Sequence, residues 1–147
     1  MQRSKLRDDR GFTLIEIMVV VVILGVLAAI IVPKFLSRPD EAKVTKTKVD
    51  IKSLEEALGL FKLDNGFYPA TDQGLKALVA KPESGRIPLK YPDGGYLRKL
   101  PADPWGNGYL YLSPGRDGRD FDLVSYGADG QPGGEKFNAD INSWEID

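Results

Sequence analysis

Residues 11–33 read GFTLIEIMVVVVILGVLAAIIVP, and this stretch decides the fold of the chain. After the first glycine, the apolar run up to the final proline is interrupted only by Thr13, Glu16 and Gly25. About 20 apolar residues, at roughly 1.5 Å of rise each, are enough to cross the hydrocarbon core of a bilayer. The stretch therefore predicts a membrane-spanning helix over residues 12–35.

Glu16 places a carboxylate inside this apolar helix. An ionised carboxylate costs about 2.5 to 3.5 kcal/mol at the centre of a membrane helix and less near the interface, so Glu16 needs a cationic partner. If the chain is cut after Gly11, Phe12 carries a free amine, and a neighbouring copy displaced along the helix axis can bring that amine to Glu16. Such pairing predicts a fixed register between assembled copies.

The string GFTLIE at residues 11–16 resembles the class III signal of type IV pilins and pseudopilins. By this resemblance, a prepilin peptidase in the membrane cuts between Gly11 and Phe12 and methylates the new Phe12 amine, and Glu16 is the assembly residue. An ordinary single-span anchor rarely has this order of glycine, aromatic and acid. A secretory signal is also disfavoured, because its apolar region is shorter, about 7 to 15 residues.

The leader before the predicted cut is basic. Residues 1–11 carry four basic side chains against Asp8 and Asp9, a net charge of plus two, and basic flanks tend to stay in the cytoplasm. We therefore expect a cleaved leader over residues 1–11, a membrane and assembly helix over 12–35, and an outer domain over 36–147. By the same resemblance, the membrane is the bacterial inner membrane and the outer domain is periplasmic.

The composition excludes several classes of function. The whole chain has a net charge of minus one, and removing the leader leaves minus three without a dense basic run, so we expect no nucleic-acid binding. Cysteine is absent, so no disulfide can staple the small outer domain, and oligomerisation or a metal remains as a staple. Histidine is absent too, which removes imidazole from catalysis and from the usual zinc sites.

Beyond Pro33 the pattern becomes amphipathic. The simplest prediction is one helix from about Phe12 to Leu63 that stops at residues 64–66, Asp-Asn-Gly, with a kink at Pro39. Apolar residues at helical spacing predict its core face: Val44, Ile51, Leu54, Leu58 and Phe61. Charged residues predict a solvated face: Lys43, Lys46, Lys48, Lys52, Glu55 and Glu56.

The remaining outer domain reads as short elements joined by loops. Residues 71–79 predict a capped short helix, and residues 81–95, rich in proline and glycine, predict a surface loop. Residues 109–112 and 121–125 have strand patterns and are joined by a turn, while Trp105 is expected to anchor the core. The expected fold class is α+β, with a long N-terminal helix, membrane-spanning and then amphipathic, packed on a small antiparallel β-sheet.

The last third of the chain contains a candidate metal loop. Residues 126–130 lead through a Pro-Gly-Gly segment to residues 138–141, so Asp129 and Asp140 bracket an irregular stretch. Carboxylates and backbone carbonyls suit calcium, which takes about six to eight oxygens. An EF-hand is rejected, because the spacing matches that loop at only a few positions and no flanking helices are evident. The alternative is that these Asp and Gly residues only form turns.

The outer domain also carries a resemblance. Residues 103–106, Asp-Pro-Trp-Gly, residues 127–130, Gly-Ala-Asp-Gly, and the Asp140-Ile141 ending before Trp144 are similar to the major pseudopilins of the type II secretion system. That family folds as a long N-terminal helix with a small sheet. It binds Ca²⁺ in its C-terminal loop, where type IV pilins commonly have a disulfide.

The resemblance implies a set of calcium ligands in this loop. Asp129 and Asp140 are the expected side-chain ligands, and the Tyr126 carbonyl is the expected third ligand. Glu135, Asn138 or further loop carbonyls would complete the shell.

The resemblance also implies a non-enzymatic filament subunit. Mature copies would be extracted from the inner membrane by an assembly platform and its ATPase. They would stack helically, together with minor pseudopilins, into a periplasmic pseudopilus that drives folded proteins across the outer membrane.

Two alternatives from other classes remain. An adhesive or motility type IV pilin shares the N-terminal signal but usually closes its C-terminal region with two cysteines. A membrane-anchored enzyme would need acid-base groups such as Asp117, Asp120 and Asp122, for which the turn and strand contexts predict ordinary solvated carboxylates.

Overall fold

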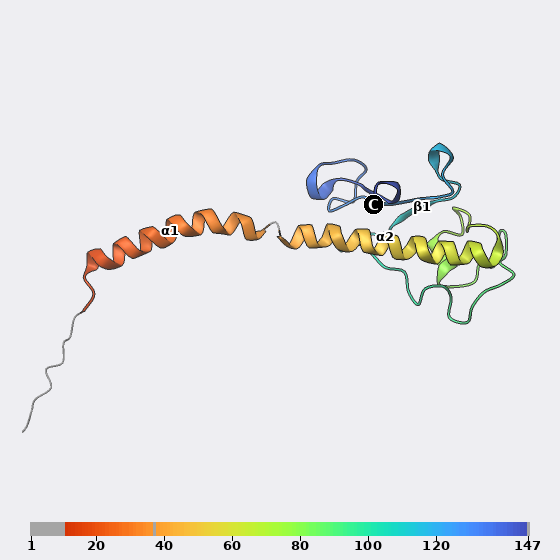
Figure 1. Cartoon of the computed structure of the whole chain (residues 1–147), viewed down its shortest axis with the longest axis horizontal. Coiled ribbons are helices and arrows are strands. Elements are labelled where there is room, and N and C mark those ends of the chain that lie inside the picture. The colour runs from red at the N-terminus through yellow and green to blue at the C-terminus, as the bar shows by residue number, and fades with distance from the viewer. Residues whose placement is uncertain (1–10, 37, 147) are drawn as a thin grey trace, which may run out of the picture. The chain divides into compact units, whose positions relative to one another are not determined.

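The computed structural model describes residues 11–36 and 38–146 of the chain. The chain divides into two units, the first ending at Arg38 and the second beginning at Pro39 (Figure 1). The basic leader residues 1–10, from which the orientation was predicted, lie outside the described residues.

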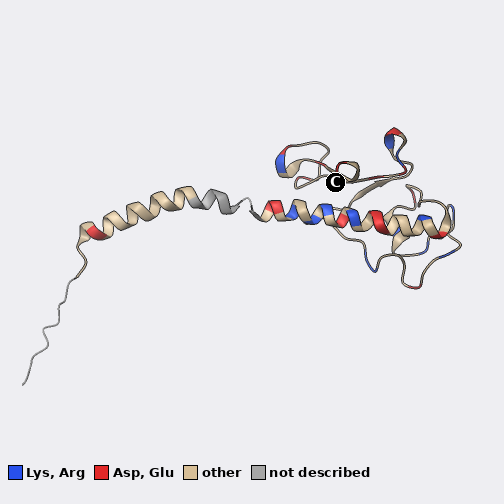
Figure 2. Cartoon of the chain, viewed as in Figure 1, with Lys and Arg blue, Asp and Glu red and all other residues tan. Residues whose placement is uncertain are grey.

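The first unit contains the helix α1, Leu14–Leu36. Its described side chains, up to Ile30, are all exposed, and all except Glu16 and Gly25 are apolar. Figure 2 shows the described part of α1 without charge apart from one acidic position near its start. Within the residues that the structure describes, no helix combines the length and the hydropathy that crossing a bilayer requires. The membrane span predicted over residues 12–35 stays a prediction.

The second unit is built on the helix α2, Arg38–Asn65. The single helix predicted over residues 12–63 is therefore described as two, and residue 37 between them lies outside the description. The C-terminal stop was predicted correctly. The N–H of Gly66 donates to the carbonyl of Lys62 at 2.6 Å, and Gly66 has a φ of 78°, which is the usual glycine termination of a helix.

One face of α2 forms the core of the second unit. Four of the five predicted core positions are completely buried: Ile51, Leu54, Leu58 and Phe61. The fifth, Val44, is partly buried against the same core. Burying each large side chain contributes about 1.5 to 3 kcal/mol, so this face holds the unit together. Other elements add further buried residues to the cluster: Leu75, Leu78, Tyr111, Leu123 and Ile141. Charged residues follow the length of α2 in Figure 2. Of the predicted solvated face, four residues are exposed and two are half-buried: Lys46, Lys48, Lys52 and Glu56, and Lys43 and Glu55.

A three-stranded antiparallel sheet packs on α2 through this core. Its strands are β1, Leu110–Leu112, β2, Asp122–Ser125, and β3, Ile141–Asn142, in the spatial order β1-β2-β3. The first two were predicted with nearly these bounds, so the α+β fold class is confirmed. The third has only two residues and no recognisable pattern of its own.

The predicted capped helix over residues 71–79 is partly wrong. The segment instead forms a short 3₁₀ helix, η1, Leu75–Leu78, preceded by Gly74 without a side-chain cap. The hydroxyl of Thr71, the first residue of the predicted helix, donates to the Ser113 carbonyl at 3.0 Å and accepts the Ser113 N–H at 2.9 Å. Thr71 therefore ties this segment to the end of β1.

The loop and the core anchor were predicted correctly. Residues 81–95 contain no helix or strand and are mostly exposed, with Leu89 95% exposed. Trp105 is half-buried and packs against the core cluster.

Candidate functional site

The first candidate site is the N-terminal end of α1. Thr13 Oγ1 accepts the N–H of Glu16 at 3.2 Å, and Glu16 Oε2 accepts the N–H of Thr13 at 3.4 Å. This reciprocal pair is a capping box, which satisfies two backbone donors at a helix start. It explains why α1 begins at Leu14. The Thr-x-x-Glu pattern was visible in the sequence, but Glu16 was interpreted only as an assembly residue and its capping role was not predicted.

The predicted cleavage point lies directly before this capping box. Gly11 and Phe12 precede the helix and are exposed, Phe12 by 76%. The structure thus brings Gly11, Phe12 and Glu16 to one exposed helix end, where the peptide bond is accessible and the carboxylate lies within one turn.

The second candidate site is the loop between β2 and β3. Ser125 lies opposite Ile141 in the antiparallel register of these strands. Extending the register by one residue places Tyr126 opposite Asp140, so two of the three expected ligands face each other at the mouth of the loop.

The two sides of the loop are in close backbone contact just beyond this mouth. The N–H of Ala128 donates to the Phe137 carbonyl at 2.9 Å. Gly127 has a φ of 63°, and a Cβ there would lie 2.7 Å from the Phe137 carbonyl oxygen and 2.9 Å from that of Ala139. Only glycine fits this position, because any side chain would separate the two backbones.

The two expected carboxylate ligands are bound to the loop backbone. Asp129 Oδ1 accepts the N–H of Gln131 at 3.1 Å, and Asp140 Oδ1 accepts the N–H of Gly133 at 2.9 Å. In the described part of the chain, Oδ2 of each has no hydrogen-bond partner. Each carboxylate is therefore oriented by one of its oxygens. Carboxylate and carbonyl oxygens are the ligands that a hard cation such as Ca²⁺ takes.

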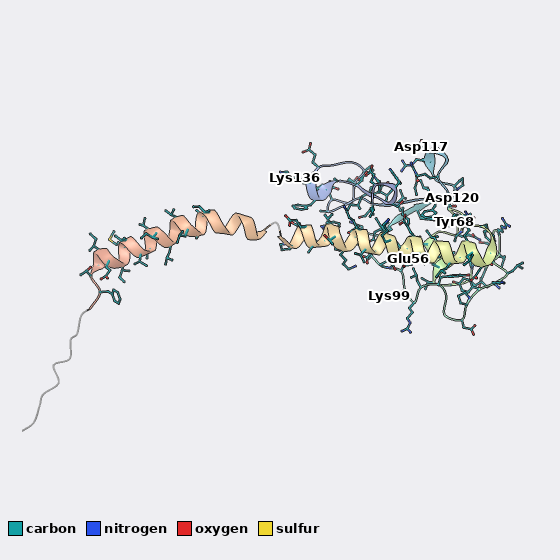
Figure 3. The ribbon with its side chains drawn as sticks, in the orientation of Figure 1. Glu56, Tyr68, Lys99, Asp117, Asp120 and Lys136 are labelled. Atoms are coloured by element: carbon teal, nitrogen blue, oxygen red, sulfur yellow. The ribbon has the colours of Figure 1, made fainter. Side chains whose placement is uncertain are left out.

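The remaining expected ligands lie at the outer end of the loop. The 3₁₀ helix η3, Lys136–Asn138, is labelled at Lys136 in Figure 3. Glu135 and Asn138 are exposed at the two ends of this turn, joined by a hydrogen bond from the Asn138 N–H to the Glu135 carbonyl at 3.1 Å. Among the described residues, no three Asp, Glu, His or Cys side chains gather closely enough to hold a metal. A cation here would need backbone carbonyls.

Asp122 is a buried charge that the sequence interpretation missed. Of the three carboxylates expected to be solvated, Asp117 and Asp120 are exposed on the β1–β2 connection (Figure 3), but Asp122 is completely buried. The Nε atoms of Arg116 and Arg119 donate to its two oxygens at 2.9 and 2.7 Å. Burial opposes ionisation, but the hydrogen bonds from Arg119 and Arg116 outweigh it and lower the Asp122 pKa to about 2. The prediction for Asp122 was wrong, and its role is structural.

Comparisons with known proteins found family matches for the N-terminal segment and for the rest of the chain. A family model described as "Type II secretion system (T2SS), protein G" matches residues 34–144, and one described as "Prokaryotic N-terminal methylation motif" matches residues 6–32. The type II secretion system core protein G of Pseudomonas aeruginosa is 59% identical over 145 residues, covering 99% of each chain. That of Vibrio cholerae serotype O1 is 54% identical over 143 residues, covering 97% of each.

A solved structure gives the same result for the fold. The crystal structure of the major pseudopilin from the type 2 secretion system of enterohaemorrhagic Escherichia coli has a TM-score of 0.65 and 43% identity, covering 74% of this chain and 92% of that one. An N-terminal methylation motif followed by a unit that matches secretion protein G places the chain in the pseudopilin class. The chain belongs to the type II secretion system protein G family, the major pseudopilins.

Family membership decides between the sequence-based alternatives. The relatives and the solved neighbour are structural pseudopilin subunits of type II secretion, which is not an enzyme family. The prediction that the chain is a structural subunit of the type II secretion pseudopilus is therefore confirmed, and the adhesive-pilin alternative is not supported.

Proposed function

We propose that the mature chain polymerises through α1 into a helical pseudopilus and that Glu16 sets the register of its subunits. The observation that carries this proposal is the place of Glu16, the one charged residue among the described, exposed side chains of α1. A neighbour's Phe12 amine, freed by cleavage after Gly11 and then methylated, is the cation that this position requires. Such a contact joins different surfaces and does not close, so it produces a filament.

The capping box is compatible with this pairing. The bond to the Thr13 N–H uses Glu16 Oε2 and leaves Oε1 for a neighbour's amine. An ionised donor makes a shorter and stronger bond than a backbone amide, so the intersubunit contact would add to the intrahelical one. The apolar side chains of α1 would supply cohesion once neighbouring helices cover them.

Before assembly, the same apolar surface would be covered by lipid. We place the helix in the inner membrane, with the N-terminus in the cytoplasm and the second unit in the periplasm. The partners of this route are the prepilin peptidase, the assembly platform with its ATPase, and the minor pseudopilins. The assembled periplasmic filament would drive the export of folded proteins across the outer membrane.

The loop between β2 and β3 is proposed as a Ca²⁺ site. Asp129 and Asp140 would contribute carboxylate oxygens and Tyr126 its carbonyl, with Glu135 and Asn138 as further candidates. The opposed positions at the loop mouth and the carboxylate oxygens without described partners support this assignment. Bound calcium would neutralise the two carboxylates and stabilise the folded loop by mass action.

The filament proposal is tested with Glu16→Gln in cells that assemble the pseudopilus. Glutamine keeps an oxygen for the Thr13 N–H but removes the charge, so the variant separates assembly from helix capping. We expect filament yield, counted by electron microscopy of sheared cells, to fall at least about tenfold while the subunit level in membranes is unchanged. The matched control is Glu41→Gln on the exposed face of α2. Wild-type filament yield from Glu16→Gln would overturn the proposal.

A further inference from the structure

A buried carboxylate outside the expected ligand set lies next to the metal loop. Asp103 is only 4% exposed. Its Oδ1 accepts the N–H groups of Trp105 at 3.1 Å and Asn107 at 2.7 Å, while Oδ2 accepts the Ser125 hydroxyl at 2.9 Å. These bonds join the turn that begins at Asp103 to the last residue of β2, where the loop starts.

The first connection reaches an expected ligand. The Ser125 hydroxyl is completely buried, and its oxygen accepts the N–H of Gly127 at 3.3 Å. That N–H shares a peptide plane with the Tyr126 carbonyl, and in a trans peptide the two groups point in opposite directions. Holding the Gly127 N–H therefore aims the Tyr126 carbonyl. The hydrogen bond that Ser125 donates to Asp103 polarises the hydroxyl and strengthens it as an acceptor.

The second connection reaches the residue that follows Asp129. The Asp103 N–H donates to the Asn107 carbonyl at 2.8 Å, so the backbone of Asn107 is held twice by Asp103. The Asn107 side chain lies against Gly130, where an added Cβ would be 3.3 Å from Asn107 Nδ2. Gly130 has a φ of 65° and directly follows Asp129. The turn therefore supports the loop on both sides of this expected ligand.

We propose that Asp103 is a positioning residue of the calcium loop, acting through Ser125 on the Tyr126 carbonyl and through Asn107 on the segment after Asp129. Asp103 itself would not touch the metal. The proposal rests on the proposed calcium function and assigns a role to the Asp-Pro-Trp-Gly turn, which otherwise has only the packing of Trp105. Groups that orient metal ligands typically change metal affinity by about 10- to 100-fold when they are removed.

Ser125→Ala tests the proposal, with Ser143→Ala as its matched control. Both serines are buried and accept a backbone N–H at 3.3 Å, but Ser143 bonds to Leu123 inside the sheet and not to the loop. Calcium affinity is measured by titration calorimetry on the mature chain in detergent. We expect Ser125→Ala to raise the calcium Kd at least about tenfold and Ser143→Ala to change it less than about twofold. Asp103→Asn, which keeps the shape of the turn, should shift the Kd in the same direction as Ser125→Ala.

A second measurement does not depend on the metal. Amide hydrogen exchange at Gly127, measured in chelator, should speed up in Ser125→Ala and not in Ser143→Ala, because only the first variant frees that N–H. Equal calcium Kd values and equal Gly127 exchange in the two variants would overturn the positioning role while the calcium site stands. A wild-type chain that binds no calcium would overturn both the calcium function and this role.

Discussion

Replacing Asp122 by asparagine should destabilise the second unit by about 2 kcal/mol at neutral pH. The two arginines lower the Asp122 pKa from 3.8 to about 2, and each pKa unit corresponds to about 1.4 kcal/mol, which gives roughly 2.5 kcal/mol. We reduce this figure to about 2 kcal/mol because the Arg116 side chain is 60% exposed and screened by solvent. For a unit of this size, the expected fall in Tm is about 8 °C.

The stabilisation by Asp122 should depend on pH. Because the folded pKa lies below the unfolded one, the stabilisation from ionised Asp122 is complete above about pH 4 and is lost as the pH falls toward about 2. Urea unfolding followed by the fluorescence of Trp105 and Trp144 measures it, since both tryptophans lie in the second unit. Asp120→Asn is the control, because that carboxylate is 62% exposed and should matter by less than about 0.5 kcal/mol. Equal losses in the two variants would refute the buried ion-pair reasoning.

Three further changes test the two candidate sites. Thr13→Ala removes half of the capping box and should lower the helix content of an isolated α1 peptide in micelles, measured by circular dichroism, at a cost of about 1 kcal/mol. Asp129→Ala should abolish a calcium-dependent rise in Tm relative to chelator. A rise of the wild-type size in that variant would remove Asp129 from the ligand set. Gly127→Ala should lower the Tm even in chelator, because its Cβ meets the Phe137 carbonyl at 2.7 Å, and an unchanged Tm would contradict the close backbone approach.

The elements that could be predicted from sequence are those with their own periodicity. The core face of α2 follows from helical spacing, and buried Leu58 and Phe61 confirm it. The end of α2 could be predicted from Gly66, because glycine readily adopts the positive φ that terminates a helix. Gly66 has such a φ in the structure. Local chemistry was sufficient in these cases.

The elements that could not be predicted depend on partners elsewhere in the chain. Thr71 was expected at the start of a short helix, but its hydroxyl binds Ser113, which lies 42 residues away. The two residues of β3 become a strand only because β2 pairs with them. Asp122 was predicted to be solvated, because nothing in its own strand indicates that the preceding turn brings two arginines into contact with it.

The candidate metal loop could be predicted only in part. Its carboxylates and glycines were visible in the sequence, and the resemblance supplied the expected ligands. The opposition of Tyr126 and Asp140 comes from a strand register that no local pattern reveals. The contact of Ser125 with Asp103, across 22 residues, is likewise a product of the tertiary fold.

The central claim is that Glu16 sets the register of the filament by pairing with a neighbour's amine. Electron cryomicroscopy of the assembled pseudopilus, at a resolution that shows side chains, measures this contact directly. The account predicts the methylated Phe12 nitrogen of one subunit within about 4 Å of the Glu16 carboxylate of the next. A filament in which every Glu16 carboxylate lacks a neighbour's amine, with the register set by contacts between the second units, would contradict it.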